Sequence, residues 1–235
     1  ADDLSNQLAR PVQFLGNPFM DPVLPPTALL SNTQPRIGLL PGSRRPELEA
    51  NLQLLLRLSD QLPDNNGISL ELALVSSLDD TGLERCANGV GWQLRDGLLQ
   101  RQGSPAVRVR RGAFQTVLQQ SDLVISMAGT AAEQAVGLAK PVLQLPGQGP
   151  QFTASFAEAQ RRLLGPTVFC APGDSGSQDN LFASAELALK LLKRIHHDLD
   201  FQKQCHTEAQ RRLGSSGGGL RMASAIGGLC PSTAP

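Results

Sequence analysis

Residues 122–146 read DLVISMAGTAAEQAVGLAKPVLQLP, and this stretch decides the fold. The apolar run 123–125 predicts a buried strand, the small residues 128–130 predict a tight turn, and the Ala-rich run 131–138 predicts a helix. Pro141 then opens a second apolar run. A strand, a turn, a helix and a second strand in this order predict one βαβ unit.

The turn of this unit permits two interpretations. A turn of small residues places unpaired N–H groups and partial positive charge at the start of a helix, which suits a phosphate or a sugar hydroxyl. Glu133 is expected in the first helical turn, close enough to bind such a ligand. Alternatively, Thr130 and Glu133 form an ordinary capping box, and the carboxylate only complements the helix dipole. The stretch alone leaves both interpretations open.

The composition limits the class of protein. The 235 residues carry 21 basic and 21 acidic side chains, 40% are hydrophobic, only 4% are aromatic, and Tyr is missing. An aliphatic core of this kind is typical of α/β proteins with parallel sheets. A zero net charge and few stacking side chains argue against a nucleic-acid partner.

The cysteines and histidines do not form a recognisable metal or disulfide pattern. The residues concerned are Cys86, Cys170, Cys205, Cys230, His196, His197 and His206. We therefore expect no metal and no cofactor. No apolar run reaches the roughly 20 residues of a membrane-spanning helix, so we expect a cytoplasmic protein, with peripheral contact at the inner membrane face left open. The chain begins with Ala, and we expect a piece of something longer.

Three regions follow one another along the chain. Residues 1–35 are expected to be an interdomain connector, because their six prolines prevent a continuous helix. Residues 36–213 alternate strand and helix patterns, which predicts an α/β domain with a single Rossmann-like, doubly wound parallel sheet. Residues 214–235 are expected to form a flexible Gly-rich break at 214–219 and a closing helix in a helical C-terminal tail.

The expected elements can be given by their ranges. Strands are predicted at 36–40, 70–75, 107–109, 123–125, 142–145 and 167–170, with a weak hairpin at 90–94 and 97–102. Helices are predicted at 46–62, 79–87, 112–119, 131–138, 152–164, 181–194, 199–213 and 220–229. Ligands of such sheets bind at the carboxyl ends of the strands near the switch point, where we expect the turns at Gly42 and Gly129.

The turn Gly42-Ser43-Arg44 lies between a predicted strand and a predicted helix. Its backbone could approach an anion closely, and the Arg44 guanidinium is a forked donor that suits a diphosphate. The turn lacks the P-loop Lys and the spacing of a dinucleotide-binding motif, so it indicates neither an ATPase nor a standard dehydrogenase. The competing interpretation is an ordinary β-to-α turn with a surface Arg.

Two further segments at the same edge carry candidate ligand groups. The turn Gly112-Ala113-Phe114 could contact a planar base through its backbone, or be a plain helix start with a core Phe. Gln148, Gln151 and Thr153 suit polyhydroxyl recognition, or belong to a solvated loop.

Groups for nucleophilic or general-base catalysis are scarce. The chain contains no G-x-S-x-G motif, and His196 and His197 are expected on a solvated helix face. The pair Asp79-Asp80 fits a helix N-cap better than a metal site.

Three segments together resemble the carboxyl-terminal half of lipid-A-disaccharide synthase, a GT-B glycosyltransferase, and most closely the synthase-related proteins typical of cyanobacteria. They are LLPGSR at 39–44, SDLVISMAGTAAEQAVGLAKPVLQLP at 121–146 and GPQFTASFAEAQRRLLGP at 149–166. Residues 14–21 resemble the segment that leaves the amino-terminal domain, and residues 212–223 resemble the closing helix. Gly217-Gly218-Gly219 stands where the relatives usually carry a Pro-Gly pair. The resemblance covers nearly the whole chain.

The resemblance implies a site for a UDP-sugar donor. Glu133 would bind the ribose, the turn 128–130 would bind the diphosphate with Ala128 in place of the usual Ser, and residues 42–44 would add phosphate contacts. Residues 112–114 would contact the uracil. The implied donor-binding residues are Gly42, Ser43, Arg44, Gly112, Ala113, Phe114, Ala128, Gly129, Thr130, Glu133, Gln148 and Gln151.

The resemblance also implies that this chain does not catalyse the reaction by itself. In this family the amino-terminal domain carries the acceptor-lipid site and the proposed general base, and transfer needs no metal. We therefore expect the UDP-sugar-binding half of a transferase that moves a hexosyl or hexosaminyl group onto a lipid or glycan acceptor. The alternatives are a UDP-N-acetylglucosamine 2-epimerase-like enzyme, which would need a His and further acids in the cleft, and a non-catalytic nucleotide-sugar-binding module.

Overall fold

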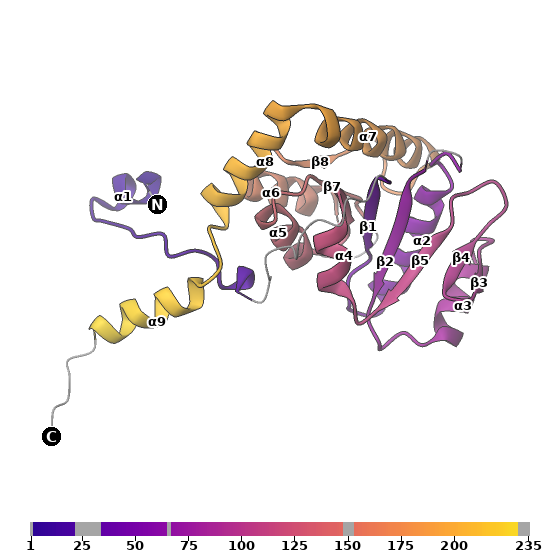
Figure 1. Cartoon of the computed structure of the whole chain (residues 1–235), viewed down its shortest axis with the longest axis horizontal. Coiled ribbons are helices and arrows are strands. Elements are labelled where there is room, and N and C mark those ends of the chain that lie inside the picture. Colours follow the sequence, from indigo (N-terminus) through magenta and orange to yellow (C-terminus); the bar gives the residue numbers. More distant parts are fainter. Residues whose placement is uncertain (1, 22–33, 65–66, 148–152, 230–235) are drawn as a thin grey trace, which may run out of the picture.

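The computed structural model of the chain describes residues 2–21, 34–64, 67–147 and 153–229. The strands of these residues form one eight-stranded sheet, and helices cover both of its faces (Figure 1). The strands are β1 Arg36–Leu40, β2 Ser69–Leu74, β3 Gln93–Arg95, β4 Leu98–Gln100, β5 Val107–Arg111, β6 Leu123–Ser126, β7 Val142–Gln144 and β8 Val168–Cys170. The helices are α1 Asp2–Leu8, the 3-10 helix η1 Pro18–Met20, α2 Glu47–Ser59, α3 Asp80–Asn88, α4 Phe114–Gln120, α5 Gly129–Gly137, α6 Ala154–Leu164, α7 Gln178–His197, α8 Leu199–Arg212 and α9 Gly218–Leu229.

The sheet has the strand order β3-β4-β5-β2-β1-β6-β7-β8. The strands β5, β2, β1, β6, β7 and β8 pair in parallel, while β3, β4 and β5 pair in antiparallel fashion at one edge. The prediction of a Rossmann-like, mainly parallel sheet is confirmed, as is the weak hairpin. From β1 the chain adds β2 and β5 on one side and β6, β7 and β8 on the other, so the strand order reverses and the switch point lies between β1 and β6.

The core lies on both faces of the sheet, because successive strand residues point to opposite sides. Leu123 and Ile125 of β6 belong to the cluster that also holds the buried residues of α2 and α7, whereas Val124 belongs to the cluster under α4 and α5. A strand buried on both sides reads as a continuous apolar run. This is why the run 123–125 could be recognised as a buried strand from its sequence.

The amino-terminal segment is bonded to the carboxyl-terminal end of the chain. The backbone N–H of Asn17 donates to the carbonyl oxygen of Leu213 over 2.8 Å. The Asp21 carboxylate accepts hydrogen bonds from the N–H groups of residues 217–219, and these bonds hold the pKa of Asp21 below its usual value. The expectation of a flexible break at 214–219 is therefore wrong at its end: α9 begins at Gly218, because Asp21 supplies acceptors to the first N–H groups of this helix.

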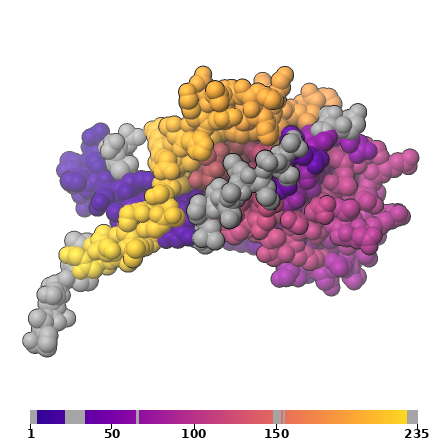
Figure 2. All heavy atoms as spheres, viewed as in Figure 1, coloured from indigo at the N-terminus to yellow at the C-terminus, as the bar shows by residue number. Residues whose placement is uncertain are grey.

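The helix α9 extends away from the rest of the molecule in the space-filling view (Figure 2). Two of its side chains, Leu220 and Ile226, are largely exposed. None of the helices in the described ranges combines the length and the apolar character that crossing a bilayer requires.

Candidate functional site

A cavity of about 650 Å³ opens at the carboxyl ends of the central strands, beside the switch point. Its walls come from the segments that follow β1, β2, β5 and β6 and from the helices α2, α5 and α6. Most of the predicted ligand residues line it, namely Gly42, Ser43, Arg44, Gly112, Phe114, Ala128, Gly129, Thr130 and Glu133. Turns far apart in the sequence thus meet around one hollow, because the carboxyl ends of parallel strands share an edge of the sheet.

One predicted residue does not line this cavity, and two others are not described by the structure. Ala113 is the N-cap residue of α4 and does not line the cavity. Gln148 and Gln151 lie outside the described residues, so their predicted contact with a donor sugar stays a prediction. Thr153, in the same predicted loop, caps α6: its hydroxyl accepts a hydrogen bond from the N–H of Phe156 over 3.2 Å.

The turns after β1 and β6 contact each other. Gly42 has a φ of +93°, a conformation that side chains other than Gly rarely adopt. A Cβ atom built on Gly42 would lie 3.7 Å from the Cβ of Ala128, at ordinary contact distance. The N–H of Met127 also donates to the carbonyl oxygen of Leu40 over 2.9 Å. The two turns therefore form one continuous floor of the cavity.

The first residue of α5 is Gly129, and this corrects two expectations. Ala128 is the N-cap and makes no side-chain cap, so Thr130 lies within the first turn and Glu133 in the second. The capping box of Thr130 and Glu133 is therefore wrong, and so is the placement of Glu133 in the first turn. The physical reason is Ser126, whose hydroxyl bonds to both the carbonyl oxygen and the N–H of Ala128, at 2.9 and 3.2 Å, and fixes the turn before Thr130.

The start of α5 presents hydrogen-bond donors to the cavity. The N–H groups of Gly129, Thr130 and Ala131 have no acceptor within the helix, since the first N–H groups of any α-helix lack one. All three residues line the cavity. Together with the positive end of the helix dipole, these donors make the start of α5 suited to an anion.

Glu133 is half-buried in the wall of the same cavity. Burial raises the pKa of its carboxyl group above the usual value, although a hydrogen bond from the side chain of Asn17 opposes the shift. Asn17 was not predicted as a site residue. It lies in the segment 14–21 that resembles an interdomain crossing, but no local pattern ties it to a residue of α5.

The charges around the cavity are mixed. Arg44 is exposed at its rim, and Glu47 lies in the first turn of α2. The neighbouring Arg45 does not line the cavity; its side chain pairs with Glu49 at 3.4 Å and donates to the carbonyl oxygen of Ser77 over 3.2 Å. The two consecutive arginines therefore have different surroundings, and of the two only Arg44 lines the cavity together with the start of α5.

Sequence reasoning missed several polar and aromatic residues of the wall. Asn51 of α2 is buried, and its Nδ2 donates to the carbonyl oxygen of Pro41 over 2.9 Å, which braces the turn after β1. Phe156 and Gln160 of α6 also line the cavity. Their spacing of four residues places both on one face of α6, and this was the signal that could have identified them.

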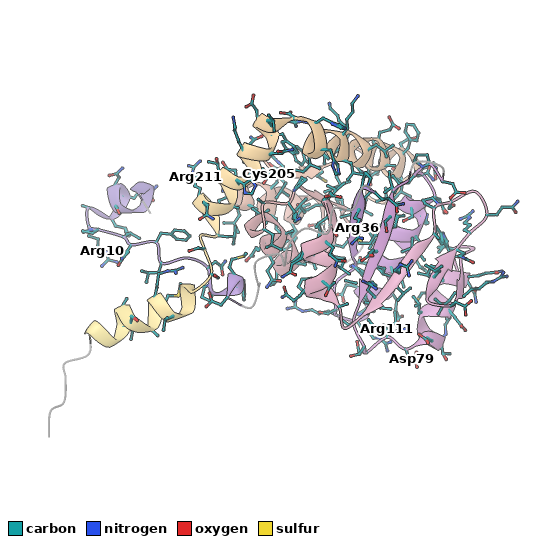
Figure 3. The ribbon with its side chains drawn as sticks, viewed as in Figure 1. Arg10, Arg36, Asp79, Arg111, Cys205 and Arg211 are labelled. Carbon is teal, nitrogen blue, oxygen red and sulfur yellow. The ribbon has the colours of Figure 1, made fainter. Side chains whose placement is uncertain are left out.

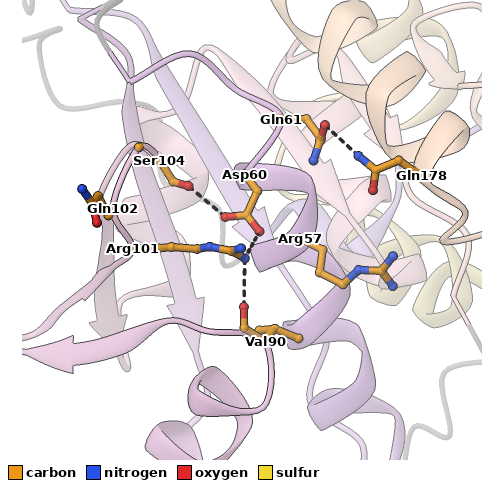
Figure 4. A pocket seen from close by; sticks show the side chains of 9 residues that line it. Arg57, Asp60, Gln61, Val90, Arg101, Gln102, Ser104 and Gln178 are labelled. Atoms are coloured by element: carbon orange, nitrogen blue, oxygen red, sulfur yellow. Dashed lines mark hydrogen bonds and ion pairs between the residues drawn. The ribbon is translucent and has the colours of Figure 1, made fainter.

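A second cavity, of about 620 Å³, lies between the end of α2, the loop from β4 to β5 and the start of α7 (Figure 4). The carboxylate of Asp60 accepts hydrogen bonds from Arg101 over 2.6 Å and from Ser104 over 2.9 Å, and Gln178 bonds to Gln61 over 3.1 Å. These polar side chains are bonded to one another. These bonds hold the loop from β4 to β5 and the start of α7 against the end of α2.

The other candidate groups of the sequence lie away from the first cavity. Asp79 is the N-cap of α3 and accepts from the N–H of Gly82 over 2.8 Å, as predicted. Arg111 lies near Asp79 (Figure 3), and its side chain pairs with the next residue, Asp80, at 2.6 Å. His196 lies 3.5 Å from the carboxylate of Asp122, at the amino end of β6. Within the described ranges, no group of three or more His, Cys, Asp or Glu is placed to hold a metal ion.

Known proteins resemble this chain in structure only. No protein-family model and no curated protein matches its sequence. The spinosyn rhamnosyltransferase SpnG complexed with spinosyn aglycone matches with a TM-score of 0.54 and 15% identity, over 92% of this chain and 51% of that chain. The same enzyme complexed with thymidine diphosphate matches with a TM-score of 0.51 and 16% identity, over 83% and 46%.

A UDP-GlcNAc 2-epimerase from Neisseria meningitidis, bound to UDP-GlcNAc, matches with a TM-score of 0.47 and 12% identity, over 86% of this chain and 45% of that chain. This likeness is too low to carry an argument. The chain spans about half the length of the structures it matches. The comparisons show that the chain has the Rossmann-like α/β fold of GT-B glycosyltransferases.

Proposed function

We propose that this chain is the nucleotide-sugar-binding half of a GT-B glycosyltransferase. The observation that carries the proposal is the single cavity at the switch point, which brings together the start of α5, Arg44 and the carboxyl group of Glu133. A volume of about 650 Å³ lies within the range of small-molecule and cofactor sites. The fold is one in which a solved glycosyltransferase is described as complexed with a nucleoside diphosphate.

The proposal assigns a different part of the cavity to the diphosphate, to the ribose and to the base of the donor. A diphosphate fits against the start of α5 and the turn at Gly42, where N–H groups and Arg44 supply positive charge. The ribose hydroxyls fit Glu133, because a carboxylate accepts hydrogen bonds from a diol. The base fits beside Gly112 and Phe114, at the ends of β5 and α4.

In its finer form, the proposal takes the donor to be a UDP-hexose or UDP-hexosamine and the acceptor to be a lipid or glycan, as for lipid-A-disaccharide synthase of the cyanobacterial type. The motifs at 39–44 and 121–146 support this form. The α5 dipole and Arg44 would stabilise the departing UDP without a metal. We place the general base and the acceptor site outside this chain, and the reaction at the cytoplasmic face of the inner membrane.

A nucleotide-sugar-binding module without catalysis is the second candidate. It is favoured by the scarcity of groups for acid–base catalysis at the cavity. Among the described residues, the ionisable side chains that line it are Arg44, Glu47 and Glu133. The epimerase interpretation would need a His in the cleft. The only His within ion-pair distance of an acid in the described residues is His196, and its partner Asp122 precedes β6 rather than following it.

Titration calorimetry of this chain with uridine, UDP and UDP-N-acetylglucosamine tests the proposal. We expect UDP to bind with a dissociation constant in the micromolar to millimolar range and Glu133→Ala to weaken the binding about tenfold or more. The matched control is Glu84→Ala, since Glu84 is exposed on α3 and does not line the cavity. Absence of UDP binding by the wild type at millimolar concentration would refute the proposal.

A further inference from the structure

The helix α6 lies over the start of α5, and Gly129 is the point of contact. Gly129 does not have a positive φ, so its backbone conformation does not require Gly. A Cβ atom at this position would, however, lie 2.8 Å from Nε2 of Gln160 and 3.9 Å from the ring of Phe156. The residue must be small because the amide of Gln160 lies directly against it.

The orientation of the Gln160 amide is fixed by a second amide. Gln144, the last residue of β7, donates from Nε2 to Oε1 of Gln160. Both side chains are buried, with exposed fractions of 5% and 8%. Because Oε1 of Gln160 is the acceptor of this bond, its NH₂ group is turned toward Gly129 and the cavity that Gln160 lines.

The NH₂ group of Gln160 is a hydrogen-bond donor at the cavity. Among the described residues it has no hydrogen-bond partner, and Nε2 is not one of the fully buried unpaired atoms, so it is open to the cavity that Gln160 lines. A donor in this position bonds to water or to a ligand. The groups beside it, the first N–H groups of α5, are also donors. An acceptor that serves all of them at once is an anion.

We infer that Gln160 donates a hydrogen bond to the diphosphate of the bound ligand, and that Gln144 is a positioning residue that acts through Gln160. The inference rests on the proposed function, because it takes the ligand of this cavity to be a nucleoside diphosphate. It adds a donor from α6 to a site whose predicted phosphate contacts come from α5 and from the turn after β1.

The inference is tested by a pair of variants, Gln160→Glu and Gln160→Leu. Glutamate keeps the length of the side chain and can still accept the bond from Gln144. A negative charge at the start of α5 also interacts favourably with the positive end of the helix dipole, so we expect the variant to fold. The same charge faces the phosphate and repels it. Repulsion alone does not identify a donor, because a negative charge near the phosphate weakens its binding in any case. Gln160→Leu removes the NH₂ donor without adding a charge, so this variant tests the hydrogen bond itself.

The experiment is calorimetry of wild type, Gln160→Glu, Gln160→Leu and Gln144→Leu with UDP and with uridine at pH 7, beside a thermal unfolding scan of each. We expect Gln160→Leu to weaken UDP about tenfold, Gln160→Glu to weaken it about a hundredfold, and Gln144→Leu to weaken it a few-fold. Uridine affinity should stay the same in all three. The matched control is Gln178→Leu, which breaks the amide pair with Gln61 in the second cavity.

The outcomes distinguish a failure of the Gln160 inference from a failure of the proposed function. If the wild type binds UDP and Gln160→Leu binds it equally well, the inference fails and the proposed function stands, whatever the charged variant does. If Gln160→Glu weakens uridine as strongly as UDP, the inference also fails, because the loss then does not depend on the phosphates. If the wild type does not bind UDP, both the proposed function and the inference that rests on it fail.

Discussion

The side-chain amide of Asn17 is hydrogen-bonded to the carboxyl group of Glu133, so the amino-terminal segment reaches the wall of the cavity. Asn17 makes two further bonds: its Oδ1 accepts from the N–H of Phe19 over 2.9 Å, and its own N–H donates to Leu213. The adjacent Gln134 donates to the carbonyl oxygen of Phe19, also over 2.9 Å. Segment 17–19, α5 and the end of α8 thus meet beside Glu133.

Replacing Asn17 by Ala should loosen this junction. We expect the free energy of unfolding to fall by about 1 kcal/mol, because hydrogen bonds to Glu133 and Phe19 are lost. Chemical denaturation measures the change, and Asn88→Ala, at the exposed end of α3, is the control. A double-mutant cycle with Glu133→Ala should give a coupling energy; strictly additive effects would show that the two side chains do not interact.

The affinity for uridine should depend on the ionisation of Glu133. Burial raises the pKa of this carboxyl group above its usual value of 4.5. A ribose diol donates to the ionised form, so affinity should be full above the raised pKa and fall as the pH drops through it. Calorimetry between about pH 4.5 and pH 7.5 measures this. Glu133→Gln should bind weakly with no such slope, and an equal slope in this variant would assign the titration to another group.

Arg44 and Arg45 should differ in their effect on binding. Arg44→Ala should weaken UDP about tenfold and uridine hardly at all, because a guanidinium at the rim of the cavity acts on the diphosphate. Arg45→Ala removes the same charge one residue further on, where the side chain pairs with Glu49 instead. It should leave the UDP affinity unchanged. Similar losses for both variants would indicate a general effect of charge.

Gly38 in the central strand β1 should not tolerate a side chain. A Cβ atom there would overlap the hydroxyl oxygen of Ser121 and lie 3.3 Å from Cγ1 of Val117, in the helix that covers this face. We expect Gly38→Ala to lower the free energy of unfolding by about 1–3 kcal/mol, the usual cost of overpacking a core.

The control for this substitution is Gly227→Ala in α9. No heavy atom of the described residues lies within 4 Å of a Cβ atom at Gly227, and Ala favours helices over Gly by up to about 1 kcal/mol. The control should therefore be neutral or stabilising in the same denaturation experiment. A neutral Gly38→Ala would show that α4 can move away from β1 at little cost.

Much of the fold could be predicted from local patterns. Buried strands such as 123–125 are short apolar runs between turn residues, and the helices from α2 to α9 were predicted from their sequence patterns. The helices α1 and η1, in the range expected to be a connector, were not predicted. The boundaries were less accurate where side chains from elsewhere set them. The α5 start depends on the Ser126 hydroxyl, and the α9 start depends on Asp21, almost two hundred residues away along the chain.

The sequence by itself determined that the chain is an α/β protein and that its turns at Gly42, Gly112 and Gly129 belong to one edge of a sheet. Strands that alternate with helices predict a parallel sheet, and parallel strands bring their carboxyl ends together. Only the tertiary structure decided which side chains share the cavity with these turns. Asn17 and Gln160 reach it because segment 17–19 and α6 pack against α5. The helical spacing of Phe156 and Gln160 places both on one face of α6, but it does not say which distant segment that face contacts.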